Sequence, residues 1–94
     1  MKQQIERVTL TGTDFEEIEF THICGKYMVK NFSDGDIYVS FDEDATEDNS
    51  VKIPAGYYQV VIANEYRGGL DIYKTKTIYI KGTGEVEVQQ LCYH

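Results

Sequence analysis

The residues best suited to chemistry lie in the acidic run from Asp42 to Asp48. Oxygen-bearing side chains stand at alternate positions of this run: Asp42, Asp44, Thr46 and Asp48. Calcium binds such oxygens, but the helix–loop–helix calcium pattern does not continue here. Glu47 stands where that loop needs glycine, and Ile53 stands where it needs a bidentate carboxylate. Two interpretations stay open, a looser calcium site at a sheet edge and a solvated acidic loop.

Two short His/Cys pairs form a second set of candidate ligands. In His22-Ile23-Cys24 and in Cys92-Tyr93-His94 the two residues are two positions apart, so within a strand they would share a face. Together the pairs could form a Cys2His2 zinc site, although structural zinc sites use wider spacing. A Cys24–Cys92 disulfide is the other pairing, but an intracellular location would keep both cysteines reduced. We therefore expect two free thiols and no cofactor.

Catalytic residues are not recognisable in this chain. A nucleophilic triad needs a base that a third group orients, and the two histidines are His22 and the C-terminal His94. The glycine-rich stretches lack the Lys-Ser/Thr and the following helix of a phosphate-binding loop. Paired carboxylates need a cleft, for which 94 residues leave little room. The sequence predicts that the protein is not an enzyme.

The elements that carry these residues are predicted to be β-strands. Apolar and polar residues alternate in four segments: Glu17–Phe20, Ile37–Phe41, Thr77–Lys81 and Glu85–Val88. The inward residues of these strands form the predicted core: Ile18, Phe20, Ile37, Val39, Phe41, Ile78, Ile80, Val86 and Val88. We predict one all-β domain over residues 1–94, an antiparallel sandwich or barrel of about seven to eight short strands. The first few residues and the last three are expected to fray.

Glycine-containing turns separate the predicted strands. Asp34-Gly35 suits a two-residue hairpin, because both central positions of that turn need a positive φ. Gly82-Thr83-Gly84 is predicted to form a second hairpin between the strands on either side of it. Pro54 fixes φ at the entry of a further turn, and Gly56 can take the left-handed conformation there.

Surface contacts are predicted from one strand and from the tyrosines. The segment Tyr57–Ala63 is apolar on both faces, which is typical of a strand in mid-sheet or of one that a partner covers. Tyrosines opposite core positions fit a contact surface and equally fit ordinary β-propensity. The candidate protein-contact residues are Tyr38, Tyr57, Val61 and Tyr79.

The charge of the chain limits its partners. The net charge is −7, and eleven acidic residues lie between Asp14 and Asp48 against Lys26 and Lys30. This acidic part would repel a phosphate backbone, so we expect no nucleic-acid partner. No apolar run approaches the ~18–20 residues of a membrane span, and the chain start lacks the apolar core of a signal peptide, so we expect no membrane partner either. The uneven charge fits oriented self-association as well as simple solubility.

Three stretches carry a resemblance to a known class of protein. Tyr27–Ser40, with the sequence YMVKNFSDGDIYVS, is followed by Ile53-Pro54-Ala55-Gly56 and by Gly84–Val88. This series resembles small virion proteins of tailed bacteriophages and prophages. The resemblance implies a non-enzymatic capsid-decoration, head–tail or tail-associated protein in many copies, with other virion proteins and further copies of itself as partners. It implies a location in the virion, or in the cytoplasm of the bacterial host before assembly, and it transfers no functional residue.

Two other functions fit the same composition. One is a carbohydrate- or cell-surface-binding β-sandwich, with tyrosines stacking on sugar and calcium held in the acidic loop; EDTA-sensitive glycan binding would indicate it. The other is an acidic mimic of DNA that occupies a nucleic-acid-binding protein, for which a salt-sensitive complex with a basic protein would be the sign.

Overall fold

The computed structural model describes residues 5–63 and 75–92. Within these residues the chain forms eight strands and one short 3-10 helix. In chain order the elements are β1 (Ile5–Thr11), β2 (Glu16–Cys24), β3 (Lys26–Asn31), β4 (Ile37–Ser40), η1 (Glu47–Asn49), β5 (Val51–Ile53), β6 (Tyr58–Ile62), β7 (Thr75–Lys81) and β8 (Thr83–Gln90).

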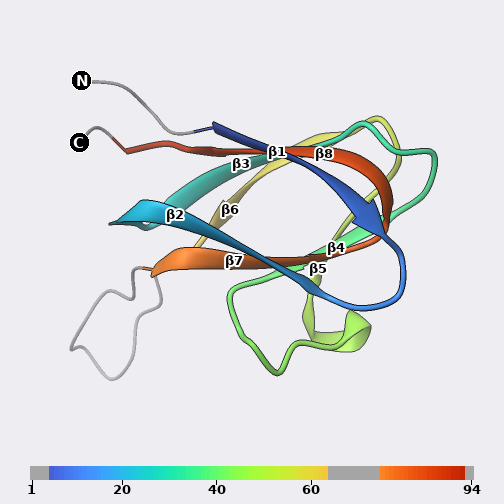
Figure 1. The fold of residues 1–94 in the computed structure, drawn as a ribbon, viewed down its shortest axis with the longest axis horizontal. Coiled ribbons are helices and arrows are strands. Elements are labelled where there is room, and N and C mark those ends of the chain that lie inside the picture. The colour runs from blue at the N-terminus through green and yellow to red at the C-terminus, as the bar shows by residue number, and fades with distance from the viewer. Residues whose placement is uncertain (1–4, 64–74, 93–94) are drawn as a thin grey trace.

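The strands form two four-stranded antiparallel sheets that pack face to face (Figure 1). Sheet A has the strand order β1-β8-β3-β6, and sheet B has the order β2-β7-β4-β5. The predicted all-β sandwich is therefore confirmed. Each sheet has two edge strands, β1 and β6 in sheet A and β2 and β5 in sheet B, and their exposed sides are where a further strand could add.

The core lies between the sheets and follows the predicted alternation. Eight of the nine predicted core residues are buried, whereas Phe41 is half-buried and packs against the cluster. Tyr27 was not on the predicted list, yet it is fully buried and lies between Phe20 and Phe41, with ring centroids 5.4 and 5.5 Å away. These three rings form an aromatic cluster within the core.

The predicted Asp34-Gly35 hairpin is wrong, because β3 and β4 belong to different sheets. The buried side chain of Asn31 organises this crossing. Its amide donates to the carbonyl oxygens of Gly35 (2.8 Å) and Ile53 (3.0 Å), and its Oδ1 accepts from the backbone N–H (2.9 Å) and the hydroxyl (2.6 Å) of Ser33. These bonds replace the ladder that a hairpin would have formed.

The predicted hairpin at Gly82-Thr83-Gly84 is also wrong, because the chain bends there from β7 in sheet B to β8 in sheet A. A Cβ on Gly82 would lie 2.7 Å from Ile37 Cγ2, and one on Gly84 would lie 2.6 Å from Ser33 Cβ. The glycines therefore serve close packing at the bend. The turn after Pro54 is confirmed, since Tyr57 N–H donates to the Pro54 carbonyl (3.1 Å) and Gly56 has φ 79°.

The expectation of two free thiols is wrong, because Cys24 and Cys92 form a disulfide. A single residue, Gly25, separates β2 from β3, and β3 pairs with β8 in a register that sets Tyr27 opposite Gln90. Two residues further along, the same register brings Cys92 next to Gly25 and hence to Cys24. The bond therefore links the end of sheet B to the end of sheet A, and it fixes Cys92, which was expected to fray.

Candidate functional site

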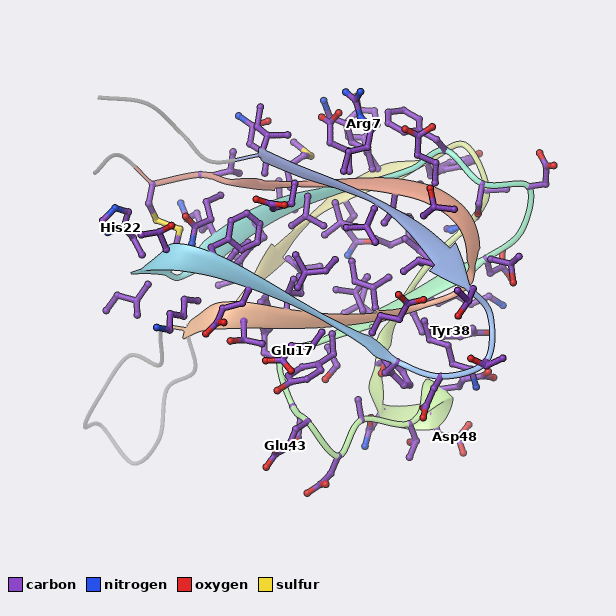
Figure 2. All side chains as sticks on the ribbon, viewed as in Figure 1. Arg7, Glu17, His22, Tyr38, Glu43 and Asp48 are labelled. Carbon is purple, nitrogen blue, oxygen red and sulfur yellow. A yellow bond between two sulfur atoms is a disulfide. The ribbon has the colours of Figure 1, made fainter. Side chains whose placement is uncertain are left out.

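The acidic loop does not gather the predicted calcium ligands. Among residues 5–63 and 75–92 no group of three or more Asp, Glu, His or Cys side chains is arranged to hold a metal ion. Figure 2 shows Glu43 and Asp48 at well-separated points of the loop. Asp42 Oδ1 instead accepts the backbone N–H of Asp44 (2.9 Å), and Asn49 Oδ1 accepts that of Thr46 (2.9 Å). Asp42, Asp44, Thr46 and Asp48 therefore share no site.

The disulfide also excludes the Cys2His2 zinc site that the sequence left open as an alternative. Both of its sulfur ligands, Cys24 and Cys92, are consumed in the disulfide, so neither can bind a metal as a thiolate. His22 is exposed beside the bond in Figure 2, and His94 lies outside the described residues.

The candidate tyrosines do not form one surface. Tyr38 and Tyr79 are half-buried on the outer face of sheet B, where Tyr38 pairs with Lys52 and Lys81 and Tyr79 pairs with Ser40. Figure 2 shows Tyr38 on the opposite side of the molecule from Arg7, which lies on sheet A. Tyr57 is exposed and directly precedes β6 in sheet A.

Val61 is not a surface residue, so this predicted contact is wrong. Its side chain is buried in the core, opposite Tyr27 of β3. The even-numbered residues of β6, Tyr58, Val60 and Ile62, face outward instead. Their exposed fractions are 69% for Tyr58, 40% for Val60 and 56% for Ile62. Because the sequence is apolar on both faces here, alternation alone could not tell which face was inside.

These three residues also hold the free hydrogen-bonding groups of β6. Ala63 N–H donates to the Gly25 carbonyl (2.7 Å), and Asn31 N–H donates to the Tyr57 carbonyl (2.9 Å), so the odd-numbered residues bond to β3. In an antiparallel pair the backbone groups of alternate residues point to opposite sides. Within the described part of the chain β6 has β3 as its one neighbour. The N–H and C=O groups of Tyr58, Val60 and Ile62 therefore point to the open side of sheet A; we call this side, with the three outward side chains, the β6 edge.

The β6 edge differs from the other three sheet edges in the described residues. Edge strands usually carry charged side chains that discourage pairing with another chain. The other edges follow this rule, with Glu6 and Arg7 on β1, Glu16, Glu17 and Glu19 on β2, and Lys52 on the three-residue β5. Strand β6 has the sequence YQVVI and no charge. The absence of charge was visible in the sequence, but the place of β6 at an edge follows from the strand order of sheet A.

A groove runs between the β6 edge and sheet B. It has a volume of about 460 Å³, and its walls come from β6 and from the chain around β4 and β5, including Phe41, Val51, Val60 and Ile62. Val51, Val60 and Ile62 are exposed apolar residues. A strand added to β6 would cover this apolar wall as well as the free backbone groups.

A charged row borders the apolar residues on the outer face of sheet A. Glu87 lies between Arg7 on β1 and Lys30 on β3, with oxygen–nitrogen distances of 2.7 and 3.3 Å. The hydrogen bond from Arg7 lowers the pKa of Glu87, and Lys30 acts in the same direction. Lys30 in turn pairs with Tyr58. The charges of this row are paired with one another, and the row ends at Lys30 on β3. The next strand, β6, has no charged residue.

A second hollow, of about 600 Å³, lies where the chain crosses between the sheets. Phe32 and Tyr38 line it together with charged residues from the surrounding loops, from η1 and from β7 and β8. Four of these charges are already paired: Lys81 with Glu47 at 3.0 Å, Asp36 with Lys52 at 3.3 Å, and Glu85 with Arg7 at 3.6 Å. The hollow is therefore a weaker candidate than the β6 edge.

No protein-family model, curated protein or solved structure matches this chain. The resemblance to virion proteins thus stays a prediction. Within the described residues, no helix has the length and apolar character needed to cross a membrane.

Proposed function

We propose that this protein is a non-enzymatic assembly domain that docks by extending sheet A along the β6 edge. The observation that carries this proposal is the uncharged edge strand, with three exposed apolar side chains on the residues whose backbone groups are unpaired by β3. Such an edge binds an incoming strand through main-chain hydrogen bonds, while its side chains select the partner.

The cost of leaving this edge open supports a docking role. Exposed apolar edge strands promote aggregation, and natural sheets normally protect them. This chain has charged residues on its other edge strands but none on β6. An edge that a partner covers in the working assembly needs no such protection.

We further propose that the assembly is a tailed-phage or prophage particle. The support for this step is the resemblance of Tyr27–Ser40 and the two later stretches to virion proteins, together with a fold that is all-β. The resemblance implies a component that acts through protein contacts and is present in many copies, which suits a small sandwich with one uncharged edge.

The test is incorporation into particles. Prophage is induced in the bacterium that encodes the chain, particles are purified on a density gradient, and the chain is quantified in the particle band by mass spectrometry. The chain should be found there in fixed ratio to the major capsid protein. Val60→Lys should reduce its incorporation at least tenfold, because a lysine on an edge strand discourages pairing with another chain.

The matched control is Ile5→Lys, which changes another exposed apolar residue, on the opposite edge of the same sheet. It should be incorporated like the wild type. Absence of the wild-type chain from the particles would refute the virion proposal, and equal incorporation of Val60→Lys would refute docking through β6.

A further inference from the structure

We infer that the strand that pairs with β6 is β6 of a second copy of this chain, in an antiparallel two-fold pair centred on Val60. This inference rests on the proposed docking role of the β6 edge and names its partner. It would join the two copies of sheet A into one continuous sheet, with the two β6 strands at its middle.

The hydrogen-bonding parity of β6 fits this pair. Tyr58, Val60 and Ile62 direct their backbone groups outward. This follows from the bonds that Ala63 makes to the Gly25 carbonyl and Asn31 makes to the Tyr57 carbonyl, which place the odd-numbered residues of β6 on the side of β3. A two-fold axis at Val60 sets Val60 opposite itself and Tyr58 opposite Ile62 of the second copy. Each of these is then a hydrogen-bonded pair that exchanges two backbone bonds. Any register shifted by one residue would place an outward-bonding residue opposite an inward-bonding one.

The side chains fit the same register. The residues at 58, 60 and 62 all lie on the outer face, so the pair would form one apolar strip across the joint. Tyr58 would lie against the β-branched Ile62 of the second copy on both sides of the axis, and aromatic and β-branched residues make favourable cross-strand pairs.

Charge selects the second copy over the other strands of this chain. Pairing β6 with β1, β2 or β5 would bring at least one charged residue against an uncharged strand, and β2 would bring three glutamates. Pairing β6 with itself brings none. The net charge of −7 on each copy opposes association at long range, so added salt should strengthen the dimer by screening it. A basic partner protein would respond to salt in the opposite way.

The experiment is cysteine crosslinking on the full chain, with the native Cys24–Cys92 bond kept oxidised. Hydrogen-bonded antiparallel pairs have Cα atoms ~5.5 Å apart, which a disulfide can bridge. Val60→Cys should therefore form a covalent dimer under mild oxidation. Ile5→Cys, exposed on the other edge of sheet A, should give at least fivefold less.

The register is read from mixtures. Tyr58→Cys and Ile62→Cys should each crosslink poorly alone, but mixing the two variants should give the heterodimer. Sedimentation of the uncrosslinked wild type should also show a monomer–dimer equilibrium. Its association constant should rise at least threefold between 20 and 500 mM NaCl, because the screening length falls from ~20 Å to below ~10 Å over this range.

Failure of this inference is distinguishable from failure of the proposed function. A wild-type chain that stays monomeric and a Val60→Cys variant that does not crosslink, while Val60→Lys still blocks incorporation into particles, would overturn the self-pairing and leave docking through β6 to another protein. Crosslinking of Tyr58→Cys with itself would overturn the register. Loss of both crosslinking and the effect on incorporation would overturn both proposals.

Discussion

Glu87 shows how a charged residue can be nearly buried on the face of a sheet. Its carboxylate is almost covered and accepts from Arg7 and Lys30 on the two neighbouring strands, so its charge is compensated on both sides. Alternation in Glu85–Val88 placed Glu87 on the outer face but could not reveal its two partners. Those partners depend on the register of β1 and β3 against β8, which is a long-range property.

The lowered pKa of Glu87 predicts a pH dependence of stability. A carboxyl whose pKa is lower in the folded than in the unfolded chain stabilises the fold above its ordinary value of 4.5, and this contribution disappears as the pH falls through the lower folded value. Glu87→Gln should therefore reduce the free energy of unfolding at pH 7 and flatten its loss below about pH 4.5. Urea titrations between pH 2.5 and 7 would measure both effects.

Glu85→Gln is the control for this titration. Glu85 faces the same Arg7, but at 3.6 Å and with half of its side chain exposed, so its removal should change the acid limb little. An acid limb that keeps the wild-type slope in Glu87→Gln would show that other carboxyls govern it.

At the scale of elements, local patterns predicted the strands but not the connections between them. The alternation of Ile18 with Phe20 and of Ile78 with Ile80 identifies the buried face correctly, because one strand determines its own two faces. The turns at Asp34-Gly35 and Gly82 instead lead from one sheet to the other. Glycine permits both a hairpin and such a crossing, and the choice depends on what packs against the turn.

Asn31 makes one of these crossings testable. Its buried side chain bonds Ser33, Gly35 and Ile53, and Asn31→Ala would leave the two carbonyls and the Ser33 N–H without these partners. We expect the free energy of unfolding to fall by about 2–4 kcal/mol, because unsatisfied buried polar groups cost ~1–3 kcal/mol each. Chemical denaturation would measure this change.

Asn49→Ala is the matched control for Asn31→Ala. Its side chain also accepts a backbone N–H, that of Thr46, but the pair is exposed to solvent. Water can replace the lost bond there, so the expected cost is below ~1 kcal/mol. Equal costs for the two variants would show that Asn31 does not organise the crossing.

At the scale of the whole molecule, the candidate site arises from which strands end up at the edges. The sequence showed that Tyr57–Ala63 is apolar and uncharged, but its position at an edge follows from the strand order β1-β8-β3-β6. The same long-range order brings Cys92 beside Cys24, although the two cysteines are 68 residues apart in the chain. Spacing of the cysteines alone therefore could not decide between thiols, zinc and a disulfide.

The disulfide closes a long loop that runs from the end of β2 to just beyond β8, and this predicts a large effect of reduction. A crosslink stabilises the fold mainly by restricting the unfolded chain, and for a separation of 68 residues the chain-entropy relation gives about 4 kcal/mol. Reduction should therefore lower the free energy of unfolding by about 2–4 kcal/mol while the sandwich core keeps the protein folded. Denaturation with and without dithiothreitol would measure the difference. A Cys24→Ser/Cys92→Ser double variant is the control, and its free energy of unfolding should be the same with and without dithiothreitol.

If the wild type were equally stable with and without dithiothreitol, the bond would not contribute to the stability of the fold. If the reduced protein unfolded outright, the core by itself would be insufficient, and assembly in a reducing cytoplasm would require the partner strand on β6 to stabilise the chain.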